Sequence, residues 1–244
     1  MFLSLDWIQM LIISFLLFLP IVYELSNTFK YYAKFALYYT IVMLTSVVVI
    51  SYGVFRPKNV KNMKFISWLM KNVKMLFGIT IEVRSKENLE IDSPYILVSN
   101  HQSSLDFFGM MEIWPENCSS LAKKELLYVG PFGLAAWLCG TVFIDRLNHE
   151  KALDTIKSTA ALIKEQNVPI IPVVFSSYSE FYSKREKKFG TGKFIISCLP
   201  KIKTEGLTAA QVPDLTDFIR KQMLDVYNQT SLETTQAKLS NGTK

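Results

Sequence analysis

The stretch Tyr95–Phe108 of the 244-residue chain reads Tyr-Ile-Leu-Val-Ser-Asn-His-Gln-Ser-Ser-Leu-Asp-Phe-Phe. It opens with an apolar run that follows the turn signal Asp-Ser-Pro, which predicts a short buried strand over 95–98. It closes with a predicted helix from Leu105, with Asp106 in the first turn, where an acidic side chain is favoured. His101 therefore lies on a predicted strand-to-helix turn, where side chains stand at the end of a sheet.

His101 and Asp106 are five residues apart, which is about 140° around one continuous helix. Their side chains can meet only if the histidine lies outside the helix and folds back over its first turn. In that geometry Asp106 holds one ring nitrogen as N–H and leaves the other free as a base. The spacing alone leaves two interpretations open, a capped helix start or a catalytic pair.

The composition predicts a membrane-associated protein with one main domain. Half of the residues are hydrophobic, and the mean hydropathy of +0.20 is high for a soluble protein. The net charge of +6 fits anionic phospholipid surfaces, phosphate-bearing substrates or nucleic acid. Nucleic acid is disfavoured, because the apolar N-terminus would tether the chain to a bilayer. Three scattered cysteines predict structural thiols in a reducing compartment, without a disulfide framework or a zinc site.

Residues 1–58 contain two apolar runs, Trp7–Tyr23 and Ala36–Phe55, each close to the ~20 residues that cross a hydrocarbon core. The first run lacks a basic leader and a small-residue cleavage site, so it predicts a retained anchor rather than a signal peptide. Basic residues follow the second run, and the positive-inside rule places residue 56 onward in the cytosol. Two full spans and a shallow hairpin on one membrane face both fit, and Pro20 and the short connector favour the hairpin.

Residues 59–228 alternate between predicted strands and helices, which indicates an α/β domain with a sheet flanked by helices. Lys61–Phe77 predicts one basic helix with an apolar face, suited either to a membrane surface or to the core. Ile79–Arg84 predicts a strand that pairs near 95–98. Val168–Phe175, with its two prolines, predicts an edge or bulged strand.

Further short strands are predicted over 120–123, 142–144 and 193–199, and helices over 105–114, 150–166 and 215–227. Residues 229–244 are polar and predict a disordered tail. The chain is therefore expected to comprise a membrane anchor, one α/β domain and this tail.

The histidine block and several later blocks resemble the glycerolipid acyltransferases, specifically the 1-acyl-glycerol-3-phosphate acyltransferases. The first block is Asn-His-Gln-Ser-x-x-Asp at 100–106. The later blocks follow in the family's order: Ala-Lys-Lys-Glu-Leu at 122–126, Gly-Pro-Phe-Gly at 130–133, Gly-Thr-Val-Phe-Ile-Asp-Arg at 140–146, Val-Pro-Ile-Ile-Pro-Val at 168–173 and Thr-Glu-Gly-Leu-Thr at 204–208. The resemblance implies that family's fold and a membrane-bound enzyme of the endoplasmic reticulum, its catalytic domain facing the cytosol.

The resemblance also implies that a fatty acyl group moves from acyl-CoA, the co-substrate, to lysophosphatidic acid, without a further cofactor. His101 then takes the proton from the acceptor hydroxyl, Asp106 fixes its tautomer, and the substrate itself is the nucleophile. A positioned base commonly contributes about 10²–10⁴-fold. Arg146 and one of Lys123 and Lys124 form the implied phosphate clamp, since a guanidinium donates two parallel hydrogen bonds to phosphate.

Ser103 and Gly140 lie in the same blocks and complete the residues implied to bind substrate. A different chemistry, in which Ser103 or Ser104 is the covalent nucleophile of a peripheral membrane hydrolase, is also open. It is disfavoured because no Gly-x-Ser-x-Gly elbow surrounds these serines. Covalent labelling with a fluorophosphonate would expose it.

One block of the family is missing from this chain. The family carries a strand that ends in Phe-Pro-Glu-Gly-Thr-Arg before the Val-Pro-Ile-Ile-Pro strand, whereas here Glu165-Gln166-Asn167 runs directly into Val168. The flanking blocks are intact, as skipping an exon would leave them. Two hypotheses therefore stand: an active lysophosphatidate acyltransferase, or a catalytically impaired variant that occupies membrane or binds lipid and partner enzymes.

Overall fold

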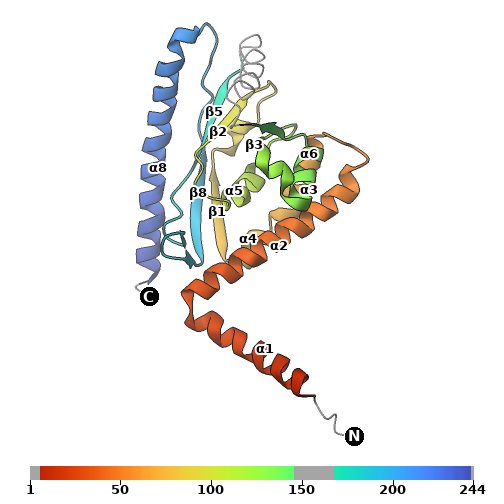
Figure 1. Cartoon of the computed structure of the whole chain (residues 1–244). Coiled ribbons are helices and arrows are strands. Elements are labelled where there is room, and N and C mark those ends of the chain that lie inside the picture. The colour runs from red at the N-terminus through yellow and green to blue at the C-terminus, as the bar shows by residue number, and fades with distance from the viewer. Residues whose placement is uncertain (1–5, 146–167, 243–244) are drawn as a thin grey trace.

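The computed structural model describes residues 6–145 and 168–242, in which helices cover both faces of a central sheet (Figure 1). The α-helices are α1 Trp7–Leu25, α2 Asn27–Gly53, α3 Lys61–Met70, α4 Val73–Leu76, α5 Asp106–Ile113, α6 Gly130–Leu138 and α8 Val212–Gly242. The strands are β1 Ile79–Arg84, β2 Ile96–Ser99, β3 Leu121–Lys123, β4 Val142–Ile144, β5 Ile170–Phe175, β6 Tyr182–Ser183, β7 Lys188–Phe189 and β8 Gly192–Cys198. Short 3₁₀ turns occur at η1 Lys86–Leu89, η2 Lys124–Tyr128 and η3 Ala209–Gln211. The α/β class is confirmed, and the helix predicted over 150–166 lies outside the described residues.

The main sheet has four strands in the order β1-β8-β5-β2. β1 pairs with β8 and β2 pairs with β5 in parallel, while β5 and β8 pair antiparallel. β3 and β4 form a separate two-stranded parallel sheet, and β6 and β7 form a small antiparallel hairpin. The structure therefore divides the predicted acyltransferase blocks between two sheets.

Of two predictions about strand pairing, one was wrong and the other was confirmed in part. β1 does not lie near β2 but at the opposite edge, where an ion pair between Lys193 of β8 and Glu82 joins the strands. β5 is an inner strand and not an edge strand, but its predicted bulged position is confirmed, since its antiparallel pairing slips by one residue between Val173–Cys198 and Ile170–Ile202. Pro172 has no N–H to donate to a ladder. It is tolerated because the ladder of β5 with β8 spans only Val173–Phe175 and does not include it. The Pro172 carbonyl still accepts a hydrogen bond from the Leu199 N–H at 2.9 Å.

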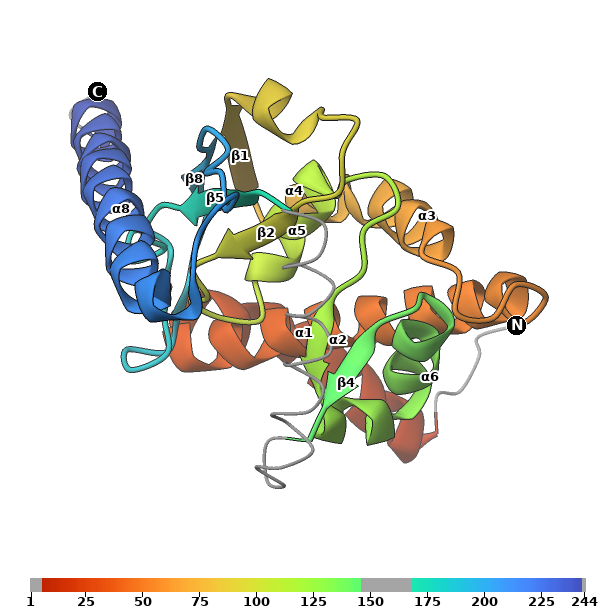
Figure 2. The ribbon, with the colours of Figure 1, turned by 90° about the horizontal axis from the view of Figure 1, so that it is seen from above.

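One face of the sheet is covered by α8 and the other by α5, behind which lie α3 and α2 (Figure 2). The core contains fully buried aromatic side chains from both layers, including Phe108 of α5 and Phe175 of β5. Gly109 of α5 permits this packing, because a Cβ there would meet the Phe194 ring at 3.2 Å. The sheet face nearest α5 is thus sealed by apolar contacts.

The N-terminal helices differ in their relation to the domain. α1 has no buried residue and extends away from the body of the molecule (Figure 1). α2 begins where Ser26 Oγ accepts a hydrogen bond from the Phe29 N–H at 3.2 Å, a normal N-cap. One face of α2 is buried at helical spacing, through Tyr31, Tyr38, Val42, Ser46, Val49 and Gly53. α1 and α2 are both long and apolar enough to cross a membrane.

The single helix predicted over Lys61–Phe77 is instead two helices, α3 and α4. They separate at Lys71 and Asn72, and asparagine has a low helix propensity. Met63, Ile66 and Met70 of α3 are buried in the core, whereas the Trp68 ring is exposed. The helix therefore belongs to the core and also presents apolar surface to the outside.

The tail predicted to be disordered from residue 229 is instead helical, as α8 continues to Gly242. Its polar side chains are accommodated by hydrogen bonds rather than by an apolar stripe. Thr230 Oγ1 donates to the Val226 carbonyl at 2.7 Å, and the Ser177 N–H donates to Ser231 Oγ at 2.8 Å. Arg84 of β1 forms an ion pair with Glu233 at 2.8 Å.

Candidate active site

The histidine loop begins where β2 leaves the sheet. The Asn100 side chain replaces the backbone ladder, since its Oδ1 accepts from the Phe175 N–H and its Nδ2 donates to the Phe175 carbonyl, both at 2.8 Å. The Gln102 amide also donates to the Phe175 and Ser176 carbonyls, at 3.2 and 3.0 Å. Side chains thus fix the loop to the end of β5, and His101 stands between the two anchored residues.

His101 and Asp106 meet in the predicted geometry. His101 precedes α5, its ring folds back over the first turn, and Nδ1 lies 2.5 Å from Asp106 Oδ2. The histidine side chain is 80% exposed and the aspartate side chain 9%. Because a carboxylate accepts and cannot donate, Nδ1 carries the proton of the neutral ring and Nε2 is left as its acceptor atom.

The Asp106 carboxylate is held by the loop itself. Its Oδ2 accepts the Gln102 N–H at 2.7 Å, and both of its oxygens lie 3.3 Å from the Ser103 N. Ser103 Oγ accepts the Leu105 N–H at 3.0 Å, so this serine shapes the turn into α5. Several charge-assisted hydrogen bonds therefore orient the carboxylate that faces the histidine.

Three tyrosines that were not predicted from the sequence lie near this loop. Tyr38 Oη of α2 donates to the Ser104 carbonyl at 2.8 Å, and Tyr39 Oη lies 3.1 Å from Ser104 Oγ. Tyr178 is buried, and burial, followed by the charge of the nearby Asp106, raises the pKa of its hydroxyl. No signal in a single sequence pairs residues 38 and 39 with residue 104, because the contact depends on how α2 packs.

The predicted phosphate-binding residues lie on the two-stranded sheet. The β3–β4 ladder places Lys123 beside Ile144, and the next residues along the chain, Lys124 and Asp145, form an ion pair at 2.8 Å. The hydrogen bond to Asp145 raises the pKa of Lys124. Arg146 follows directly in sequence and lies outside the described residues. The structure thus brings the lysines to the end of β4 and leaves the clamp itself a prediction.

Gly140, also predicted to bind substrate, forms the turn between α6 and β4. Its φ of +77° is in the region that favours glycine, and an added Cβ would meet the Lys58 carbonyl oxygen at 3.2 Å. Ser119 Oγ donates to its carbonyl at 2.7 Å. The structure therefore assigns this glycine a conformational requirement, and any substrate contact remains a prediction.

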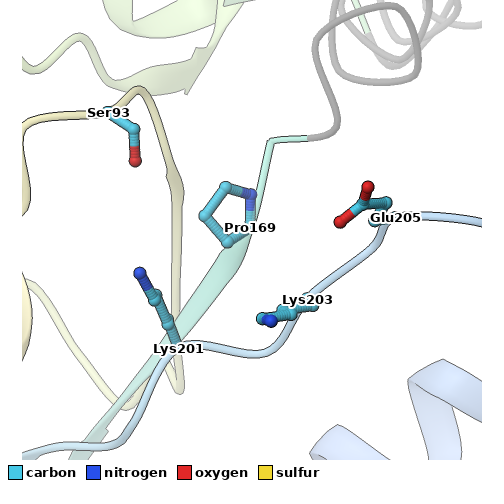
Figure 3. A pocket seen from close by; sticks show the side chains of 5 residues that line it. All are labelled: Ser93, Pro169, Lys201, Lys203 and Glu205. Carbon is cyan, nitrogen blue, oxygen red and sulfur yellow. The ribbon is translucent and has the colours of Figure 1, made fainter.

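A cavity of about 180 Å³ lies at the other end of the main sheet (Figure 3). It is lined by residues from the segments before β2 and β5 and after β8: Ser93, Pro169, Lys201, Lys203 and Glu205. Since His101 follows β2 and Ser93 precedes it, this cavity is separate from the histidine loop. Within residues 6–145 and 168–242, no cluster of histidine, cysteine, aspartate and glutamate could hold a metal ion.

Comparisons with known proteins point in one direction. The family model described as Acyltransferase matches residues 80–195. The chain is 36% identical to human 1-acyl-sn-glycerol-3-phosphate acyltransferase alpha, across 88% of this chain and 87% of that protein. It is 32% identical to a putative 1-acyl-sn-glycerol-3-phosphate acyltransferase of Caenorhabditis elegans, across 93% and 92%. The crystal structure of the 1-acyl-sn-glycerophosphate acyltransferase PlsC from Thermotoga maritima matches the fold with a TM-score of 0.61 at 17% identity, covering 86% of this chain and 97% of that one.

These alignments also bear on the missing block. The alignment with the human protein spans 247 positions, more than the 244 residues of this chain, although only 88% of the chain takes part. The relative therefore contains residues with no counterpart here. In this chain β2 pairs directly with β5, in parallel and over four residues.

Proposed function

Because the chain belongs to the 1-acyl-sn-glycerol-3-phosphate acyltransferase family, we propose that it moves a fatty acyl group from acyl-CoA to 1-acyl-glycerol-3-phosphate and so forms phosphatidic acid. The observation that carries this proposal is the His101–Asp106 pair. An exposed imidazole, with its Nδ1 proton directed at a buried and oriented carboxylate, is the arrangement that a general base requires.

In the proposed reaction, His101 Nε2 removes the proton from the acceptor hydroxyl while Asp106 stabilises the imidazolium that forms. The hydroxyl oxygen bonds to the carbonyl carbon of the thioester, and the carbon–sulfur bond then breaks. His101 returns its proton to the departing coenzyme A thiolate. Protons and electrons balance without an enzyme-bound acyl group, so no nucleophilic serine is required.

The proposed phosphate clamp consists of Arg146 and one of Lys123 and Lys124. Among the described residues Lys123 forms no ion pair, whereas Lys124 already binds Asp145, so Lys123 is the more available of the two lysines. Arg146 is carried over from the family's block by its position in the sequence. An ammonium and a guanidinium near one another would neutralise most of a phosphate monoester's charge.

We further propose that α1 and α2 form a hairpin in the cytosolic face of the endoplasmic reticulum membrane rather than two spans. α2 supports this, because the face containing Tyr38 and Val42 packs on the domain while the opposite face, with Leu37, Leu44 and Val48, exposes apolar side chains. A helix that buries one face in its own domain cannot be surrounded by lipid.

The hairpin is tested by a cysteine at the connector. Ser26→Cys in a Cys118→Ser background leaves the two buried native thiols in place. If the hairpin forms, a membrane-impermeant maleimide added to sealed microsomes should label position 26 without permeabilisation. Two full spans would place residue 26 in the lumen, and labelling only after permeabilisation would refute the hairpin.

The second candidate is a catalytically impaired variant of the same family, confined to binding membrane or partner enzymes. The missing Phe-Pro-Glu-Gly-Thr-Arg block, and the alignment that exceeds the chain in length, favour it. The deciding experiment measures acyl transfer from oleoyl-CoA to lysophosphatidate in membranes that contain the whole chain. Turnover above that of His101→Ala supports the enzyme, and turnover equal to it supports the impaired variant.

A further inference from the structure

The loop between His101 and Asp106 is connected to the N-terminal helix α2 at one residue, Ser104. Tyr38 Oη donates to the Ser104 carbonyl at 2.8 Å, and Tyr39 Oη contacts Ser104 Oγ at 3.1 Å. Among the described residues, these are the hydrogen bonds that reach Ser104 from outside the loop and α5. A helix that the sequence marks as a membrane anchor thus contacts the segment that positions the proposed base.

Burial and ring packing hold the Tyr38 side chain in a fixed position. It is 3% exposed, and its ring packs against Phe108 of α5 and Phe77, with centroid distances of 5.1 and 6.1 Å. Rings packed in this way hold the hydroxyl without a further loss of side-chain freedom. The Tyr39 ring, by contrast, is exposed, so Tyr38 provides the stronger restraint.

The two halves of the loop are restrained by different parts of the molecule. Asn100 and Gln102 attach its first half to the end of β5. Ser104, in its second half, is attached to α2. The histidine, which is exposed and held by one side-chain hydrogen bond, lies between these two restraints.

We propose that Tyr38 is a positioning residue, through which α2 holds the His101–Asp106 pair in its productive geometry. The anchor helix is then part of the catalytic structure and not only a tether. This inference rests on the proposed function for its kinetic consequence. It makes a structural statement about the loop that can be tested without turnover.

The kinetic test compares Tyr38→Phe with Tyr95→Phe in the full-length chain. Tyr95 Oη also donates to a backbone carbonyl, that of Leu89 at 3.0 Å, but at the far end of β2, so the control loses the same kind of bond. Tyr38→Phe should lower kcat about 3- to 10-fold, the range for one hydrogen bond, with KM for both substrates unchanged. Tyr95→Phe should leave kcat unchanged. The two variants should lower the melting temperature by similar amounts. Equal kcat in the two variants would overturn the proposal.

A second measurement does not depend on turnover. The chain has two histidines, so His149→Gln leaves His101 as the sole histidine for carbethoxylation by diethyl pyrocarbonate, and formation of carbethoxyhistidine is followed. Nε2 reacts fastest when Nδ1 is held by Asp106, and Asp106→Asn provides the reference for a released ring. Tyr38→Phe should slow modification toward that reference, and Tyr95→Phe should not.

The two readouts separate the possible failures. Turnover of the parent chain no greater than that of His101→Ala would refute the proposed function and leave the carbethoxylation comparison to decide the role of Tyr38. Equal modification rates in Tyr38→Phe and Tyr95→Phe would refute the positioning role whether or not the chain is active.

Discussion

The two sheets that carry the family's sequence blocks differ in burial and in side-chain hydrogen bonding. The four-stranded sheet presents His101 and Asp106 from a buried core, with side-chain hydrogen bonds closing each end of the loop. The two-stranded sheet of β3 and β4 carries the lysines on strands of three residues each, and its Leu121 side chain is 60% exposed. No strand ladder joins them among the described residues.

The difference separates chemistry from substrate binding. The proposed acid–base pair needs only β2, β5, α5 and α2, all of which are present and packed. The proposed clamp depends on β3, β4 and the stretch after them, and the family's missing block falls between that stretch and β5. We therefore expect the missing block to weaken phosphate binding more than it impairs the proposed acid–base pair.

The largest expected effect tests the chemical half. His101→Gln should lower kcat/KM about 10²- to 10⁴-fold, because the general base is lost. The side chain is exposed, so the free energy of unfolding should change by less than about 0.5 kcal/mol. Acyl transfer and thermal unfolding, measured on the same preparation, check both parts. A kcat/KM within tenfold of the parent would remove His101 from the proposed role.

The second test compares the cores of the two sheets. Ile171→Ala on β5, where the side chain is fully buried, should lower the free energy of unfolding by about 2–5 kcal/mol. Leu121→Ala on β3 should lower it by less than about 0.5 kcal/mol. Denaturant unfolding of the whole chain in detergent measures both. Equal losses would mean that β3 shares the main core.

The third test restores the missing block. A segment that ends in the family's Phe-Pro-Glu-Gly-Thr-Arg block would be inserted between Asn167 and Val168. An added arginine–phosphate interaction should lower KM for lysophosphatidate about 10- to 150-fold, equivalent to about 1.5–3 kcal/mol. The same insert with its arginine changed to alanine supplies the strand without the guanidinium. If both inserts lower KM for lysophosphatidate equally, the missing strand and not the missing guanidinium weakens substrate binding in the parent chain.

The smallest expected effect concerns the lysines. Lys123→Ala should raise KM for lysophosphatidate about 3- to 10-fold, since one exposed cation contributes modestly to phosphate binding. Lys124→Ala should have less effect, because Asp145 already occupies its ammonium group. KM for a monoacylglycerol, which has no phosphate, provides the control. A parallel rise with that acceptor would show that Lys123 acts on something other than phosphate.

Local features of this fold were predictable from sequence. The strand before His101 and the helix after it follow from polar and apolar patterning over a dozen residues, whereas the spacing gave only the condition under which His101 meets Asp106. The family was predictable for a related reason, since its blocks are short and contiguous. Both predictions depend on residues that are adjacent in the sequence.

Contacts between distant segments were not predictable. β1 pairs with β8 rather than near β2, and β5 is central despite its prolines, because ladder partners are set by how the layers pack. α8 runs past residue 229 because Ser231 and Glu233 find partners on Ser177 and Arg84. Tyr38 meets Ser104 across 66 positions of sequence for the same reason.

The ladder between β2 and β5 has a consequence for aggregation of this chain. Its parallel register covers the edge of β5 that would otherwise offer bare amides and carbonyls to passing chains. Quality-control machinery that recognises exposed strands would find no such mark along β5. The free edge at this side of the sheet belongs instead to β2, which has four residues, and so short an edge strand is a poor template for pairing with another chain.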